Sequence, residues 1–124
     1  MPVFGALMVF FAMANAGLPG TSGFVGEFMV ILASFQVHPM LAFTAAMTLV
    51  IGAAYTLWLV KRVIFGDIGN AHVAELEDIN PREWIVMSVF AIGVLLIGLY
   101  PKPLTDLMEP AIAQLASQLA ISKL

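Results

Sequence analysis

The run Gly17-Leu18-Pro19-Gly20-Thr21-Ser22-Gly23-Phe24-Val25-Gly26-Glu27-Phe28 decides how this chain folds. Pro19 lacks a backbone donor and clashes with the preceding turn of a helix, and the neighbouring glycines lower the cost of leaving helical geometry. Thr21 or Ser22 is suited to cap a helix that restarts after such an interruption. The run therefore predicts a helix that is broken at Leu18-Pro19-Gly20 and then resumes.

The composition places this broken helix in a membrane. Hydrophobic residues make up 61% of the 124 residues and charged residues only 10%, which is too little charge to cover the surface of a soluble domain. The absence of cysteine excludes disulfides, thiolate metal sites and cysteine nucleophiles, and two isolated histidines predict no metal site. A net charge of −3 without a basic run gives no indication of nucleic-acid binding.

The positions of the charged residues divide the chain into spans. No charged residue occurs over 3–26 or over 28–60. A spanning helix needs about 20 apolar residues, so the second stretch is too long for one helix, and Pro39 marks the natural boundary. The prediction is three transmembrane helices: a broken one over 1–37, a second over 38–65 and a third over 84–100.

A polar connection, 66–83, joins the second and third spans. Asn80 is expected to cap the third span, with Pro81 at its first position and Glu83 near the positive end of the helix. Lysine and arginine concentrate around this connection, so the positive-inside rule places it on the cytoplasmic side. The basic residues concerned are Lys61, Arg62 and Arg82.

The last segment, 101–124, alternates apolar and polar residues at helical spacing. This pattern predicts an amphipathic helix on the membrane surface or on neighbouring subunits. The fold class is therefore an all-α membrane protein with three transmembrane helices, the first one broken, and a C-terminal amphipathic surface helix.

Glu27 is the candidate functional residue. An ionised carboxylate at membrane depth costs roughly 2.5–3.5 kcal/mol on insertion scales, so it must pair with a cation, contact water or hold its proton. The last two options make Glu27 a proton carrier, whereas the first makes it a static ion-pair partner. No cation of the three spans lies deep enough to pair with it. The partner is therefore expected outside this chain.

Other residues near the break have structural explanations. Gly23 and Gly26 indicate close helix packing. Asn15 is expected to be buried and to form a hydrogen bond between helices, and His38 to be a turn residue at a helix boundary.

The run from Phe10 to Phe28 strongly resembles the antiporter-like subunit M family of respiratory complex I, which is chain 4 of the mitochondrial NADH–quinone oxidoreductase. The similarity continues through Phe65-Gly66 after a basic pair, through Arg82-Glu83, and through Leu99-Tyr100-Pro101-Lys102-Pro103-Leu104. It covers essentially the whole chain but only about the last quarter of a family member.

The resemblance implies that these spans are the last three core helices of a fold with two inverted repeats, each containing a broken helix. Glu27 falls on the family's carboxylate at the end of a lysine–glutamate proton relay, where the sister chains and antiporter subunits usually carry lysine. The first broken helix and the central lysines are missing. We therefore expect either a truncated piece or a split gene product that is inactive alone and needs a missing N-terminal portion of the same subunit.

The leading functional hypothesis is a proton-translocating membrane subunit of a redox-driven NADH–quinone oxidoreductase, with Glu27 as its relay carboxylate. No cofactor or metal is expected in this chain, because NADH, flavin, iron–sulfur clusters and quinone belong to partner subunits. A cation/proton antiporter subunit, a related membrane-bound hydrogenase subunit and a structural membrane subunit are the alternatives. The expected location is the bacterial inner membrane, with the mitochondrial inner membrane as the alternative.

Overall fold

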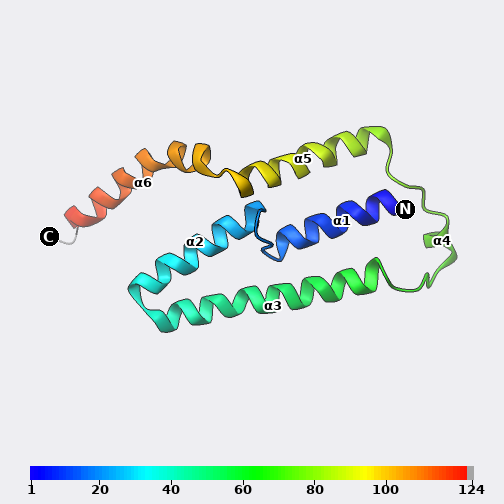
Figure 1. Ribbon diagram of the computed structural model, residues 1–124, viewed down its shortest axis with the longest axis horizontal. Coiled ribbons are helices and arrows are strands. Elements are labelled where there is room, and N and C mark those ends of the chain that lie inside the picture. Colours follow the sequence, from blue (N-terminus) through cyan, green and yellow to red (C-terminus); the bar gives the residue numbers. More distant parts are fainter. Residues whose placement is uncertain (123–124) are drawn as a thin grey trace.

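The computed structural model describes residues 1–122, and within them all regular secondary structure is helical (Figure 1). The helices are α1 (Pro2–Asn15), α2 (Ser22–Val37), α3 (Pro39–Val63), α4 (Ala71–Ala74), α5 (Pro81–Leu99) and α6 (Lys102–Ser122).

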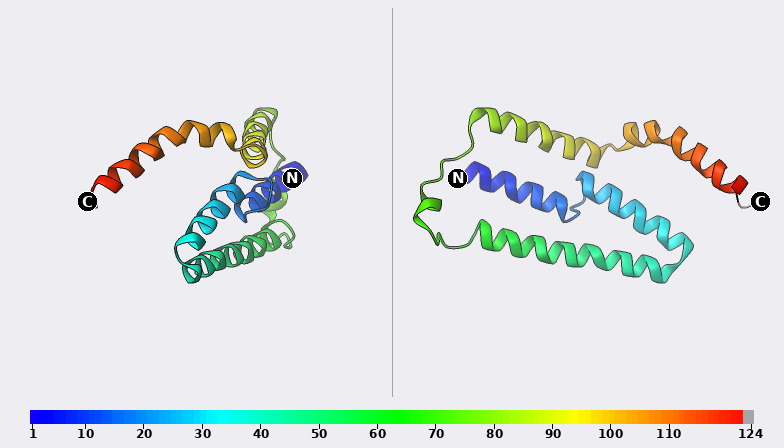
Figure 2. Two further views of the ribbon diagram at one scale, coloured as in Figure 1. Left: turned by 60° about the vertical axis from the view of Figure 1, so that its left-hand side comes forward. Right: turned by 180° about the vertical axis from the view of Figure 1, so that it is seen from behind.

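The two halves of the broken helix form the middle of the bundle. α1 and α2 run one after the other in the same direction, with α2 displaced towards α5 at the break. α3 returns beside them on one side, and α5 lies on the other side (Figures 1 and 2). The N-terminus and α4 lie at one end of the bundle, and α6 projects from the opposite end. The break between α1 and α2 is therefore enclosed between two long apolar helices.

The helix boundaries agree with the turn residues that were predicted. His38 alone separates α2 from α3, with extended backbone angles, and Pro39 is the first residue of α3. Asn80 precedes α5, Pro81 opens it, and the Asn80 N–H donates to a Glu83 carboxylate oxygen at 2.9 Å. The short helix α4 within the polar connection was not predicted.

Most apolar side chains of this chain point outward. Among the described residues, the buried hydrophobic ones are only Ala14, Ala42 and Val60, whereas large side chains such as Trp58 and Phe90 are more than 60% exposed. α3 and α5 are long and apolar enough to cross a membrane, and α1 and α2 are shorter apolar helices. These outward surfaces suit contact with lipid or with further protein.

The polar connection folds back onto the start of α1. The carboxylate of Asp78 accepts hydrogen bonds from the backbone N–H groups of Val3 at 2.9 Å and Phe4 at 3.0 Å. These donors have no partner within their own helix, because the first turn of any helix leaves its N–H groups free. The hydrogen bond from Val3, assisted by those from Phe4 and Ile79, lowers the pKa of Asp78 below its usual value.

The tail predicted over 101–124 is helical from Lys102 to Ser122, and residues 123–124 lie outside the described residues. Pro110 lies inside α6, which the sequence prediction did not consider. A proline there has no N–H to donate to the carbonyl of Asp106, so the helix loses one internal hydrogen bond at that point.

Candidate functional site at the helix break

α1 ends in a Schellman motif, a helix ending in which two N–H groups bond back to carbonyls of the last turn. The Gly17 N–H donates to the Ala14 carbonyl at 3.2 Å, and the Leu18 N–H donates to the Met13 carbonyl at 3.1 Å. Gly17 has φ of +83°, a left-handed conformation that favours glycine. The predicted break is therefore present, and a glycine makes it possible.

The helix resumes as α2 after a tight turn, but no hydroxyl side chain caps its first turn. Thr21 occupies the cap position of α2, but its side chain forms no bond with the start of that helix. Its hydroxyl instead donates to the Leu18 carbonyl at 2.6 Å, and its backbone N–H donates to the same carbonyl at 3.1 Å. The predicted capping role of the side chain is wrong, because the buried hydroxyl is used to close the turn itself.

Glycines allow the backbones around the break to approach each other closely. A methyl group on Gly23 would lie 2.5 Å from the Ala14 carbonyl oxygen, so α2 contacts the end of α1 there. A methyl group on Gly98 of α5 would lie 2.5 Å from the Thr21 carbonyl carbon and would also overlap the Gly20 carbonyl. The packing predicted for Gly23 is confirmed, whereas Gly26 meets nothing within 4 Å in this chain.

Gly98 is a site residue that the sequence prediction missed. Glycine in a helix costs roughly 1 kcal/mol relative to alanine, so a glycine within an apolar helix indicates a packing requirement. α5 contains a second such glycine, Gly93, which has nothing within 4 Å. Only the packing of the helices distinguishes the glycine at the break from the other one.

The carboxylate of Glu27 folds back towards the end of α1. A methyl group on Gly17 would lie 2.7 Å from the Glu27 Oε2 atom and 3.5 Å from a methyl carbon of Leu49 in α3. The carboxylate therefore lies where α1 ends and α3 passes. Within this chain Glu27 is exposed, because no described element covers the outer face of α2; its position at membrane depth stays a prediction.

The basic residues of α3 lie far from this carboxylate. Lys61 and Arg62 occupy the last turn of α3. Lys61 is twelve residues beyond Leu49, which corresponds to roughly 18 Å along a helix. A cationic partner for Glu27 from outside this chain stays a prediction.

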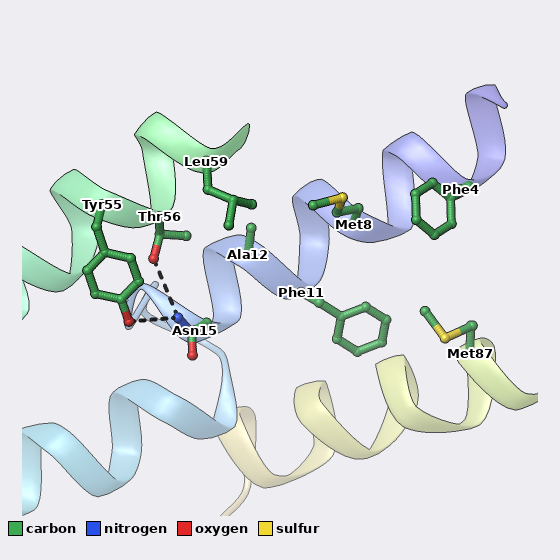
Figure 3. Close-up of a pocket in the computed structure, with 9 residues that line it drawn as sticks. All are labelled: Phe4, Met8, Phe11, Ala12, Asn15, Tyr55, Thr56, Leu59 and Met87. Atoms are coloured by element: carbon green, nitrogen blue, oxygen red, sulfur yellow. Dashed lines mark hydrogen bonds between the residues drawn. The ribbon is translucent and has the colours of Figure 1, made fainter. Parts of the chain in front are cut away.

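A separate cavity of about 430 Å³ lies between α1, α3 and α5 (Figure 3). Asn15 lies at one end of it, and its Nδ2 atom donates to the hydroxyl oxygens of Tyr55 and Thr56, each at 3.4 Å. The predicted hydrogen bond between helices is confirmed, but Asn15 is exposed and not buried. The remaining lining residues are Phe4, Met8, Phe11, Ala12, Leu59 and Met87, so the cavity is mainly apolar and does not include Glu27.

Comparison with known proteins finds similarity in the part of the chain that contains the break. Residues 1–56 match the family described as NADH:quinone oxidoreductase/Mrp antiporter, TM. We refer to residues 1–56 as the antiporter-like segment. The matched residues of the antiporter-like segment include the whole break, Glu27, and Asn15 with its two hydroxyl partners.

Relatives resemble the chain well beyond the antiporter-like segment. NADH-quinone oxidoreductase subunit M of Rhodobacter capsulatus is 43% identical over 115 residues, which are 93% of this chain and 22% of that protein. NADH-ubiquinone oxidoreductase chain 4 of Marchantia polymorpha is 38% identical over 93% of this chain and 23% of that protein. Subunit M of Escherichia coli K12 is 36% identical over 89% of this chain and 22% of its own length.

The chain thus spans less than a quarter of the length of these relatives. Its apolar helices, its outward apolar surface and its similarity to these membrane subunits together indicate an integral membrane protein.

Proposed function

We propose that this chain is part of a proton-translocating membrane subunit of a redox-driven NADH–quinone oxidoreductase, and that Glu27 is a relay carboxylate. The similarity to subunit M and chain 4 proteins over most of the chain supports the assembly. The single observation that carries the relay role is the position of the Glu27 carboxylate against the interruption between α1 and α2.

A carboxylate at such an interruption is suited to proton transfer. A helix that breaks within a membrane leaves backbone groups that need polar partners, and these are tolerated only where they face protein or water. Ion transporters use the same arrangement to bind their ions at half-helix ends. Within the described residues, the basic side chains of α3 lie in its last turn, away from the Glu27 carboxylate.

The redox chemistry is assigned to other subunits. NADH, flavin, iron–sulfur clusters and quinone would bind there, and this chain would bind no redox cofactor. Its contribution to the enzyme is then to move protons along side chains while electrons move elsewhere. Its partners are the other membrane subunits and the remaining part of the same subunit.

The helix lengths support three membrane crossings. α1 has 14 residues and α2 has 16, or about 21 Å and 24 Å, so each is too short alone for a hydrocarbon core of about 30 Å. Together they form one broken crossing, and α3 and α5 form the other two. The polar connection with Asp78 then faces the cytoplasm or its equivalent, and α6 lies along the opposite surface against neighbouring subunits.

A cation/proton antiporter subunit is the second candidate, because the matching family also includes Mrp antiporters. In that case Glu27 would exchange protons against sodium. Sodium dependence of transport separates the antiporter from the redox-driven pump.

The test is NADH-driven proton pumping in membranes whose intact complex carries Glu27→Gln, with quinone reduction followed in parallel. Glutamine keeps the shape of the side chain but cannot carry a proton. Glu77→Gln in the exposed polar connection is the matched control. We expect pumping to fall sharply for Glu27→Gln alone while the complex still assembles; unchanged pumping would refute the relay role.

A further inference from the structure

We propose that Gly17 is a positioning residue for Glu27, because its missing side chain leaves the space that the carboxylate occupies at the helix break. This inference rests on the proposed relay function of Glu27. It assigns to one glycine of the break a role in proton transfer beyond its role in ending α1.

Gly17 satisfies two independent requirements. Its φ of +83° ends α1 in the left-handed conformation, which asparagine also adopts in other helix endings. The second requirement is space, because a methyl group on Gly17 would lie 2.7 Å from the Glu27 Oε2 atom. Ordinary contact begins at 3.4 Å, so even alanine would displace the carboxylate by about 0.7 Å.

The space beside Gly17 lies next to α3 as well. It is bordered by Leu49 of α3, at 3.5 Å from the position of the missing methyl group. Glu27 is exposed, and an exposed glutamate on a helix samples several rotamers, so the space at Gly17 decides whether the rotamer that reaches the break is available. Its outer side is uncovered in this chain, so a proton donor or acceptor from outside can approach it there.

Position matters because proton transfer needs a heavy-atom distance of about 2.6–3.2 Å, directly or through one water. A misplacement of about 1 Å can slow a positioned reaction roughly 100-fold. For a displacement of about 0.7 Å we expect proton transfer through Glu27 to slow by roughly 10-fold or more. The number of protons pumped per NADH oxidised should fall accordingly.

Gly20 provides a matched control within the same break. It also has a left-handed backbone, with φ of +92°, so alanine is strained there as well. A methyl group on Gly20 would meet only a methyl carbon of Leu99, at an ordinary 3.6 Å, and not Glu27. Gly17→Ala and Gly20→Ala therefore share the backbone strain and differ in contact with the carboxylate.

The experiment compares Gly17→Ala, Gly20→Ala, Glu27→Gln and the double variant Gly17→Ala/Glu27→Gln in the intact complex. Proton pumping is divided by NADH oxidation, and the amount of assembled complex is measured separately. We expect the ratio to fall for Gly17→Ala towards that of Glu27→Gln, and to stay near wild type for Gly20→Ala. In the Glu27→Gln background, Gly17→Ala should cause no further loss, because both changes act on one group.

Equal ratios for the two alanine variants would overturn the positioning role while leaving the relay intact. Normal pumping by Glu27→Gln would instead overturn the proposed function itself. If Gly17→Ala prevents assembly, Gly17→Asn decides, since asparagine adopts the left-handed conformation more readily but still adds a side chain against the Glu27 carboxylate. A lowered ratio for Gly17→Asn supports the positioning role, and a wild-type ratio refutes it.

Discussion

Replacing Gly98 by alanine should separate α5 from the helix break. The added methyl group would lie 2.5 Å from both the Gly20 and the Thr21 carbonyl carbons, whereas carbon atoms in contact prefer about 3.5–4.0 Å. α5 would have to move by roughly 1 Å. These opposing atoms are backbone, so they cannot rotate away as the end of a side chain can.

The cost can be bounded from two opposing effects. Overpacking of this kind typically costs about 1–3 kcal/mol, and a rigid backbone on both sides favours the upper part of that range. Alanine gains about 1 kcal/mol over glycine in the interior of a helix. A net destabilisation of about 1–2 kcal/mol remains, which is roughly a 5- to 30-fold change in the equilibrium between docked and undocked α5.

The assay is the amount of intact complex in solubilised membranes and its loss of quinone reductase activity on heating. Gly93→Ala is the matched control, because Gly93 lies in the same helix with nothing within 4 Å of its missing methyl group. We expect Gly98→Ala to lower the amount of intact complex and to shift the loss of activity to a lower temperature. Gly93→Ala should leave both the amount and the temperature unchanged or raise them. If the two variants behave alike, the close approach of α5 to the break is refuted.

Three smaller effects follow from contacts elsewhere in the chain. Asp78→Asn should weaken the docking of the polar connection on α1. Hydrogen bonding lowers the pKa of Asp78, so the carboxylate stabilises the protein above the ordinary pKa, and this stabilisation is lost as the pH falls through the lowered pKa. The thermal stabilities of wild type and variant should therefore converge only in acid. Thr21→Val removes the hydrogen bond from the Thr21 hydroxyl to the Leu18 carbonyl. It should destabilise the complex by about 1 kcal/mol, measured as faster loss of activity on heating, with no change in the number of protons pumped per NADH. Asn15→Leu should cost only about 0.6 kcal/mol by the same heat-stability assay, since its bonds are long; a severe assembly defect would contradict this estimate.

The local features of this protein follow from the covalent structure of individual residues. Pro19 and the adjacent glycines interrupt a helix, Pro39 opens a new one after His38, and Pro81 opens another, because the covalent structure of these residues restricts the backbone wherever they occur. The scarcity of charge likewise fixed the membrane class, since no folding arrangement can make so apolar a chain cover itself with polar groups.

Which of these residues contact one another depends on how the helices pack. Gly98 contacts the break and Gly93 does not, Asp78 reaches α1 across more than seventy residues, and Glu27 turns back to Gly17 while its outer face stays exposed. Such contacts depend on where helices cross and how they are rotated, which small residues permit but do not specify. The local sequence specifies where each helix begins and ends, whereas the position of the Glu27 carboxylate depends on how α1, α2 and α3 pack together.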